Sequence, residues 1–220
     1  MILIPVKNLS RAKQRLASVL DQAARTELAQ AMLHDVVAAV AAWSGRTAAA
    51  LVTSDPFAVA LARKYDLEII PDPANPGETG AIEMATRLCV ERGIDRTLVI
   101  PADIPLIEAS ELEEIFAHAP DAGSLLVPAA DGRGTNAAFR RPADLFPLRF
   151  GNDSFKPHLA AAQATGKPCR VLQLPGIALD VDNPADLQEL LTADGETRAQ
   201  GLIRRWKLGH VFLATGTEDL

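Results

Sequence analysis

The sequence lacks several features that would assign it to a class directly. It has only two cysteines, Cys89 and Cys169, which lie far apart in apolar surroundings. Their spacing fits no metal site, so we expect free, buried thiols. Neither of the glycine-rich phosphate-binding patterns, G-x-x-x-x-G-K-[ST] or G-x-G-x-x-G, follows the first strand-like segment. Any nucleotide is therefore expected to be held by side-chain charge more than by a backbone cradle.

An excess of positive charge and a long apolar run are also missing. The formal net charge is -6, whereas general nucleic-acid binders are more often basic, so no nucleic-acid partner is expected. The apolar runs are interrupted too early to span a bilayer, and Met1 opens onto a strand-like segment with no basic region before it. These features predict a cytoplasmic protein without a membrane partner.

What the sequence does contain is an alternation of strand-like and helix-like segments. Its 220 residues, of which 48% are hydrophobic, suffice for one large domain. Strands are predicted over residues 2–6, 48–53, 67–70, 97–100, 124–128, 137–140, 169–174 and 179–182. Helices are predicted over residues 11–43 with a break near 21, 55–65, 80–92, 109–118, 154–165, 184–191 and 196–206. The alternation predicts a single α/β domain over residues 1–206, with a mainly parallel sheet covered by helices on both faces, and a loosely held tail at 207–220.

Asp103 follows a predicted buried strand, on a turn stiffened by Pro101 and Pro105. In open α/β sheets, ligands lie beyond the carboxyl ends of the strands. A carboxylate at that place suits a hard cation such as Mg²⁺. The alternative is that Asp103 caps the following helix, and this segment by itself leaves the two interpretations even.

Two more carboxylates, Asp180 and Asp182, are two residues apart on a segment that is predicted to be extended, so they point to the same face. Like charges on one face repel unless a positive group lies beside them. If this segment neighbours the strand before Asp103, the three carboxylates would form a Mg²⁺ site. The alternative for Asp182 is a helix start, because Asn183 and Pro184 follow it.

Four cations follow the first strand: Lys7, Arg11, Lys13 and Arg15. Such a cluster where a strand passes into a helix suits a polyphosphate. The alternative is a solvated helix face, which we favour for Arg11.

Hydroxyl groups next to glycines mark two other segments. Thr135 follows Gly134, and Ser154 follows Gly151 at the predicted start of a helix. Hydroxyls and backbone N–H groups in such turns bind small anions such as phosphate or carboxylate. The alternative is simple helix capping by Ser154.

Histidine offers little by comparison. The four histidines are scattered, most of them on predicted helix surfaces, and show no ligand spacing. No Ser/His/Asp or Cys/His arrangement is evident, so a covalent intermediate is not expected.

Several blocks together resemble one family, the 2-phospho-L-lactate/phosphoenolpyruvate guanylyltransferases of coenzyme F-420 biosynthesis, in the MobA-like nucleotidyltransferase superfamily. The matching blocks are residues 4–9 (IPVKNL), 12–16 (AKQRL), 31–36 (AMLHDV), 103–106 (DIPL), 134–136 (GTN), 150–155 (FGNDSF) and 179–187 (LDVDNPADL). They extend over nearly the whole chain to about residue 192.

The resemblance implies a Rossmann-like nucleotidyltransferase fold, GTP and Mg²⁺ as reactants, and pyrophosphate as product. Carried over residue by residue, it implies that Thr135, Gly151 and Ser154 bind the phospho-acid. It implies that Asp103 and the pair Asp180 and Asp182 hold Mg²⁺. It also implies that Lys7, Lys13 and Arg15 meet the GTP phosphates, with Lys13 and Asp103 as catalytic residues.

The chain departs from the family pattern at residues 77–83 (GETGAIE), where many members have a Gly-Leu-Asn block near the nucleotide. Glu78, Thr79 or Glu83 would then read the guanine edge, to which a carboxylate is suited. Of the three-carbon acceptors, phosphoenolpyruvate is favoured over 2-phospho-L-lactate and 3-phospho-D-glycerate.

Two other functions are considered. One is a nucleotidyltransferase for a sugar phosphate or a molybdenum cofactor, and the other is a non-catalytic GTP-binding regulator. A homodimer is a further hypothesis, because the apolar residues within 202–213 could pack on a partner subunit; the alternative is that they pack on the chain's own core.

Overall fold

The computed structural model describes residues 1–45, 48–74, 77–151 and 153–206. Seven strands form a single sheet in the order β3-β2-β1-β4-β6-β5-β7. Their bounds are β1 Ile2–Pro5, β2 Ala49–Val52, β3 Glu68–Ile70, β4 Thr97–Val99, β5 Gly123–Pro128, β6 Thr135–Arg141 and β7 Cys169–Val171. β6 runs antiparallel to both of its neighbours, and the remaining pairs are parallel. The sheet is therefore mainly parallel, as predicted.

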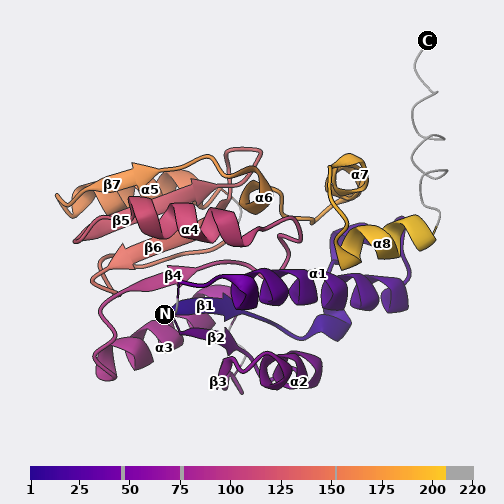
Figure 1. Cartoon of the computed structure of the whole chain (residues 1–220), viewed down its shortest axis with the longest axis horizontal. Coiled ribbons are helices and arrows are strands. Elements are labelled where there is room, and N and C mark those ends of the chain that lie inside the picture. Colours follow the sequence, from indigo (N-terminus) through magenta and orange to yellow (C-terminus); the bar gives the residue numbers. More distant parts are fainter. Residues whose placement is uncertain (46–47, 75–76, 152, 207–220) are drawn as a thin grey trace, which may run out of the picture.

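Helices cover both faces of this sheet (Figure 1). They are α1 Gln22–Ala42, α2 Pro56–Lys64, α3 Glu78–Glu91, α4 Ala109–His118, α5 Phe155–Ala164, α6 Pro175–Ala178, α7 Pro184–Thr192 and α8 Arg198–Arg205. α1, α2 and α4 bury apolar side chains on one face, and α3 and α5 do so on the other. A third apolar cluster joins α1 to α7 and α8, so the end of the described chain packs back onto the first long helix.

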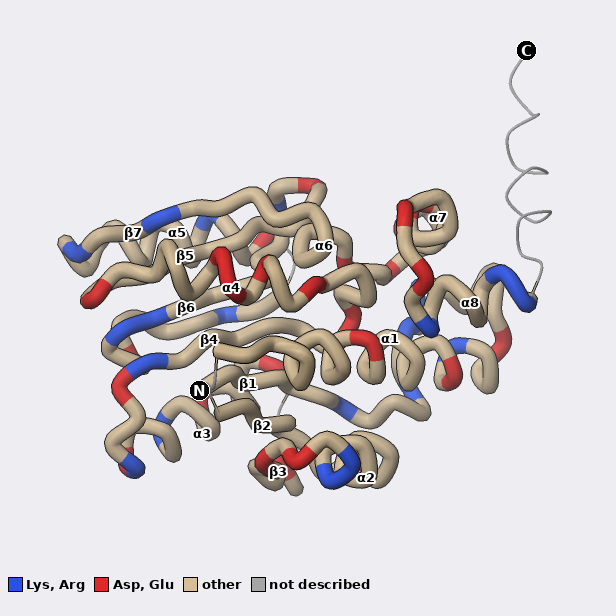
Figure 2. The backbone as a smooth tube through the Cα atoms, viewed as in Figure 1, with Lys and Arg blue, Asp and Glu red and all other residues tan. Residues whose placement is uncertain are grey.

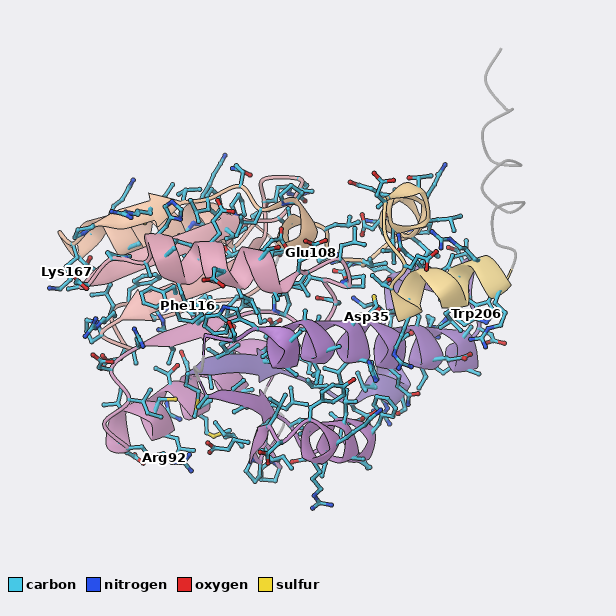
Figure 3. All side chains as sticks on the ribbon, viewed as in Figure 1. Asp35, Arg92, Glu108, Phe116, Lys167 and Trp206 are labelled. Carbon is cyan, nitrogen blue, oxygen red and sulfur yellow. The ribbon has the colours of Figure 1, made fainter. Side chains whose placement is uncertain are left out.

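The helix boundaries follow from local side-chain chemistry. Asp21 accepts a hydrogen bond from Ala24 N at 2.8 Å and begins α1, and Asp55 does the same for α2 with Pro56 in the first turn. Asp35, in the middle of α1, accepts from the backbone N–H groups of Arg198 and Ala199 at 2.9 Å. Asp35 therefore caps α8 although it belongs to α1, and Figure 3 shows it next to the start of α8.

Two predicted elements are wrong. Residues 11–20 do not form a helix but two 3-10 turns, Leu9–Arg11 and Gln14–Leu16, separated by Lys13 in the left-handed conformation with φ of 55°. Residues 179–182 form no strand. The segment follows α6, a helix that was not predicted. It is tied to the loop after β4 by a backbone hydrogen bond from Val181 N to Asp103 O at 3.1 Å. The alternation correctly marked Leu179 and Val181 as buried, but the segment does not pair with any of the described strands.

The remaining expectations fall partly outside the described residues. Residues 207–220 are not described, so the predicted tail and part of the apolar 202–213 segment lie outside the described residues. Leu202 and Ile203 are buried in the cluster that joins α7 and α8 to α1. The homodimer stays a prediction. Among the described residues, no helix is long and apolar enough to cross a membrane. Acidic and basic residues are interspersed along the described chain (Figure 2).

Candidate active site

A cavity of about 930 Å³ lies where the chain leaves β1, β4 and β5. Its lining includes all the residues predicted for the site apart from Thr79 and Glu83, namely Lys7, Lys13, Arg15, Glu78, Asp103, Thr135, Gly151, Ser154, Asp180 and Asp182. Parallel strands direct their carboxyl ends to one edge of the sheet, and the loops there form the crevice in which such folds bind ligands. Arg11, which we had assigned to a solvated helix face, is exposed but also lines this cavity.

A buried lysine holds two of the carboxylates. Lys13 Nζ donates to Asp103 Oδ2 at 2.6 Å and to Asp182 Oδ1 at 2.8 Å, and its side chain is only 7% exposed. Arg15 Nη1 approaches the other oxygen of Asp182 at 3.6 Å. The left-handed backbone at Lys13, between the two 3-10 turns, is the local feature that places its side chain between residues 90 and 169 positions away in sequence. A non-glycine residue in this conformation is uncommon and is characteristic of functional sites.

These contacts shift the protonation equilibria. Burial alone would lower the pKa of Lys13, but the charges of Asp103 and Asp182 raise it above its ordinary value. Burial opposes ionisation of Asp182, yet Lys13 and then Arg15 lower its pKa. The Lys13 ammonium and the Asp182 carboxylate therefore stay charged at neutral pH, and Lys13 also pairs with Asp103 in this partly desolvated site.

Asp180 lies in a different environment. Burial, together with the charges of Asp103 and Asp182, raises its pKa to about 6 against the lowering effect of the hydrogen bond from Asn136. Asn136 Nδ2 donates to Asp180 Oδ1 at 3.0 Å and to the carbonyl oxygens of Ile177 and Ala178. Asn136 thus fixes Asp180 to the last turn of α6, and it is a positioning residue to which the sequence analysis assigned no role.

The carboxylates suit a hard cation by type, although Lys13 takes part of their capacity. Within the described ranges, no three His, Cys, Asp or Glu side chains already converge as metal ligands. Asp103 accepts from Lys13 through Oδ2, and Asp180 accepts from Asn136 through Oδ1, so the other oxygen of each lies outside these contacts. Mg²⁺ in nucleotide enzymes is commonly bound by one or two carboxylates plus substrate phosphates. The residues present fit such a site. Asp103 caps no helix, because α4 begins at Ala109 behind Glu108.

On the opposite wall of the cavity, two turns meet. Thr135 N donates to Ser154 Oγ at 3.1 Å, and Phe155 N donates to Arg133 O at 2.8 Å. An exposed ion pair between Arg133 and Asp153 also joins the two turns. Thr135 and Ser154 are both buried. Ser154 stands at the N-cap position of α5 but makes no side-chain cap hydrogen bond, so the capping alternative is wrong.

Gly151 and Thr79 complete this wall. Gly151 has φ of 144°, in the region that side chains rarely adopt, and a Cβ there would meet no atom within 4 Å. The glycine therefore serves the backbone path and leaves open space beside it. Thr79 does not line the cavity. Its hydroxyl accepts from Phe150 N at 3.0 Å, which ties the start of α3 to the residue before Gly151.

The three residues considered for reading guanine separate in the structure. Glu78 lines the cavity, and burial, followed by the charge of Asp103, raises its pKa to about 7 while Lys7 opposes the shift. Thr79 supports the Phe150 backbone. Glu83 lies in a second, smaller cavity beside Arg140 and Asp144, and so is not part of this site.

His158 contributes to the site, although histidine showed no functional pattern in the sequence. It is 1% exposed, rather than on a helix surface, and its Nδ1 lies 2.9 Å from Thr135 Oγ1. Its position at the first turn of α5, four residues after Ser154, is the only signal that the sequence offered.

Comparison with known proteins finds guanylyltransferases, both as a family model and as individual relatives. The family model described as "Guanylyl transferase CofC like" matches residues 1–217. A phosphoenolpyruvate guanylyltransferase from Sphaerobacter thermophilus is 36% identical over 187 residues, covering 85% of this chain and 90% of that protein. A 2-phospho-L-lactate guanylyltransferase from Methanothermobacter thermautotrophicus is 32% identical over 203 residues, covering 92% of this chain and 89% of that protein.

Solved structures agree on the fold. A protein from Desulfovibrio desulfuricans G20, described as a nucleotide-diphospho-sugar transferase, superposes with a TM-score of 0.76 at 18% identity, covering 97% of this chain and 96% of that one. A cytidylyltransferase from Leptospira borgpetersenii superposes with a TM-score of 0.59 at 11% identity, covering 100% of this chain and 98% of that one. The fold is that of the nucleotidyltransferases, and the chain belongs to the CofC family of guanylyltransferases.

Proposed function

We propose that this guanylyltransferase moves GMP from GTP to the phosphate of a three-carbon phospho-acid, with phosphoenolpyruvate as the preferred acceptor, and releases pyrophosphate. The observation that carries the proposal is that one cavity unites a basic segment, a carboxylate cluster and a wall of hydroxyl groups beside glycines. These are the three kinds of group that a polyphosphate, its cation and an anionic acceptor require. In its family, the product enters coenzyme F-420 biosynthesis.

The basic segment after β1 is assigned to the GTP phosphates. Lys7 and Arg15 line the cavity, and Arg15 Nη1 lies 3.6 Å from Asp182 Oδ2. Lys13 holds Asp103 and Asp182 together at 2.6 and 2.8 Å, so its ammonium lies beside the metal ligands. Charge placed in advance where a transition state gains negative charge lowers the barrier without reorganisation at the moment of reaction.

Asp103 and Asp180 are assigned as the principal Mg²⁺ ligands, each with one oxygen outside its present contacts. Asp182, engaged by Lys13 and Arg15, completes the carboxylate set. A bound Mg²⁺ would neutralise phosphate charge and hold the reacting groups in line.

The reaction is an in-line displacement. An oxygen of the acceptor phosphate attacks the α-phosphorus of GTP, the new P–O bond forms, and the bond between that phosphorus and the oxygen bridging to the β-phosphate breaks. Pyrophosphate leaves with the bonding electron pair. No general base is required because the attacking phosphate is already ionised, so positioning and charge neutralisation supply the catalysis.

The acceptor acid is assigned to the wall formed by Thr135, Gly151 and Ser154, where hydroxyl groups and open backbone face the cavity. The relative from Sphaerobacter thermophilus is named for phosphoenolpyruvate, which supports that acceptor. Glu78 is the candidate for reading guanine, because of the three residues considered it alone lines the cavity. A carboxylate accepts well from the N1–H and N2–H₂ edge of that base.

Pyrophosphate release tests the proposal. The protein is incubated with Mg²⁺ and either GTP or ATP, together with phosphoenolpyruvate, 2-phospho-L-lactate or 3-phospho-D-glycerate. We expect release with GTP and phosphoenolpyruvate above all other pairs. Asp103→Asn should abolish it, whereas Asp95→Asn, which removes an exposed partner of Arg141 outside the cavity, should not. GTP binding without pyrophosphate release from any acceptor would instead indicate a regulator.

A further inference from the structure

We infer that His158 is a positioning residue that fixes the Thr135 hydroxyl as a hydrogen-bond donor to the anionic acceptor. The inference rests on the proposed function, since it assumes that the acceptor acid lies against Thr135. It assigns a role in acceptor binding to a buried histidine that does not itself line the cavity.

The tautomer of His158 follows from its backbone partner. Arg149 N lies 2.7 Å from His158 Nε2, and a backbone N–H can only donate. Nε2 therefore accepts and carries no proton. The neutral imidazole must then carry its proton on Nδ1, which faces Thr135 Oγ1 at 2.9 Å. His158 Nδ1–H donates to the threonine hydroxyl.

This assignment fixes what the hydroxyl can do. Its oxygen receives the bond from His158, and within the described part of the chain this is the one hydrogen bond that Thr135 Oγ1 makes. Its own proton is thus left for another acceptor, and Thr135 lines the cavity. An oxygen of a phosphate or carboxylate is the acceptor that such a hydroxyl suits.

The neighbouring Ser154 hydroxyl is arranged in the same way. Its hydroxyl oxygen accepts from Thr135 N at 3.1 Å and, among the described residues, makes no other hydrogen bond. Two neighbouring hydroxyl oxygens thus receive hydrogen bonds from the protein and keep their protons for a ligand. Without these bonds, the hydroxyl groups of Thr135 and Ser154 could rotate and either donate or accept a hydrogen bond.

The environment keeps His158 in the required state. It is buried beside the Phe150 ring, with centroids 5.3 Å apart, and burial together with the charge of Arg140 lowers its pKa to about 4. A protonated ring would place a second N–H against Arg149 N–H. The neutral form is therefore the one compatible with both of its contacts.

Two substitutions of His158 distinguish the hydrogen bond at Nδ1 from the hydrogen bond at Nε2. Gln places its amide group near the position of Nε2, so His158→Gln keeps an acceptor for Arg149 N–H and loses the donor to Thr135. Asn places its amide near the position of Nδ1, so His158→Asn keeps a donor to Thr135 and loses the acceptor. The KM values for GTP and phosphoenolpyruvate are measured for both variants by pyrophosphate release, with folding checked by circular dichroism and thermal melting.

We expect His158→Gln to raise the KM for phosphoenolpyruvate about tenfold, the effect of one hydrogen bond to a charged group, and to leave the KM for GTP unchanged. His158→Asn should keep the KM for phosphoenolpyruvate within about twofold of wild type while melting at a lower temperature. In a Thr135→Val background, which lacks the hydroxyl, adding His158→Gln should raise the KM no further.

The inference fails if His158→Gln leaves the KM for phosphoenolpyruvate unchanged, if both variants raise the two KM values alike, or if the effects of Thr135→Val and His158→Gln multiply. If His158→Asn does not fold, the double-substitution comparison decides. If His158→Gln does not fold, Thr135→Val decides, because an unchanged KM for phosphoenolpyruvate in that variant contradicts the inference. Failure of the proposed function is distinguishable, because the wild-type protein would then release no pyrophosphate with any of the three acids, and the role of His158 would fall with it.

Discussion

The buried histidine makes acid sensitivity the sharpest quantitative prediction. In the folded protein the pKa of His158 is about 4, compared with an ordinary value of 6.5, because of burial and then the charge of Arg140. Between these two pH values His158 is protonated in the unfolded chain and neutral in the folded protein. The free energy of unfolding therefore falls as the pH is lowered through this window, and His158 contributes no further change below it.

The size follows from linkage. Full passage through the window corresponds to about 3 kcal/mol, and the part between pH 7.5 and pH 5 amounts to about 2 kcal/mol. The ring is 1% exposed, so solvent screening reduces this little. Other ionisable groups titrate over the same range, and a matched variant without an imidazole is needed to isolate the term.

Denaturant unfolding of the wild type and of His158→Gln, at pH 7.5, 6 and 5, measures it. The variant should begin less stable because it loses a buried hydrogen bond, but it should lose about 2 kcal/mol less than the wild type over this range. Parallel pH dependences for the two proteins would refute the reasoning, since they would show that His158 has the same pKa in both states.

Three further changes test other parts of the structure. Asp35→Ala removes the carboxylate that accepts from Arg198 N and Ala199 N, and should lower the free energy of unfolding by about 1–2 kcal/mol with pyrophosphate release retained; an unchanged melting temperature would contradict the capping role. Gly151→Ala forces a side chain into φ of 144°, which should cost about 1–3 kcal/mol in urea unfolding and raise the KM for the acceptor acid, and an unaltered KM would argue against that wall. Lys13→Met leaves two partly buried carboxylates without their ammonium, so turnover should be abolished and stability at neutral pH reduced by up to about 3 kcal/mol; full activity would remove Lys13 from the catalytic residues.

Much of the fold was readable from the sequence because its local signals are strong. Buried strands have continuous apolar runs, and helices such as α2 begin at a capping Asp followed by Pro. The alternation of these units then dictates a mainly parallel sheet. The same logic placed Asp103 beyond the end of β4, at the edge where such sheets bind ligands. The segment 179–182 was misassigned because alternating polarity records only which side chains face inward, and strand pairing depends on a neighbour that the segment does not have.

The relationships between distant residues were decided by tertiary structure alone. The sequence shows Lys13 as one of four cations, and only packing reveals that its ammonium lies between Asp103 and Asp182. It shows His158 as one of four scattered histidines, and only the fold brings Nδ1 to Thr135 and Nε2 to Arg149 N–H. Local sequence determines strands, turns and caps because these depend on neighbouring residues. The protonation state of a buried group and the direction of its hydrogen bonds depend on residues brought near by the whole fold, and no local pattern contains them.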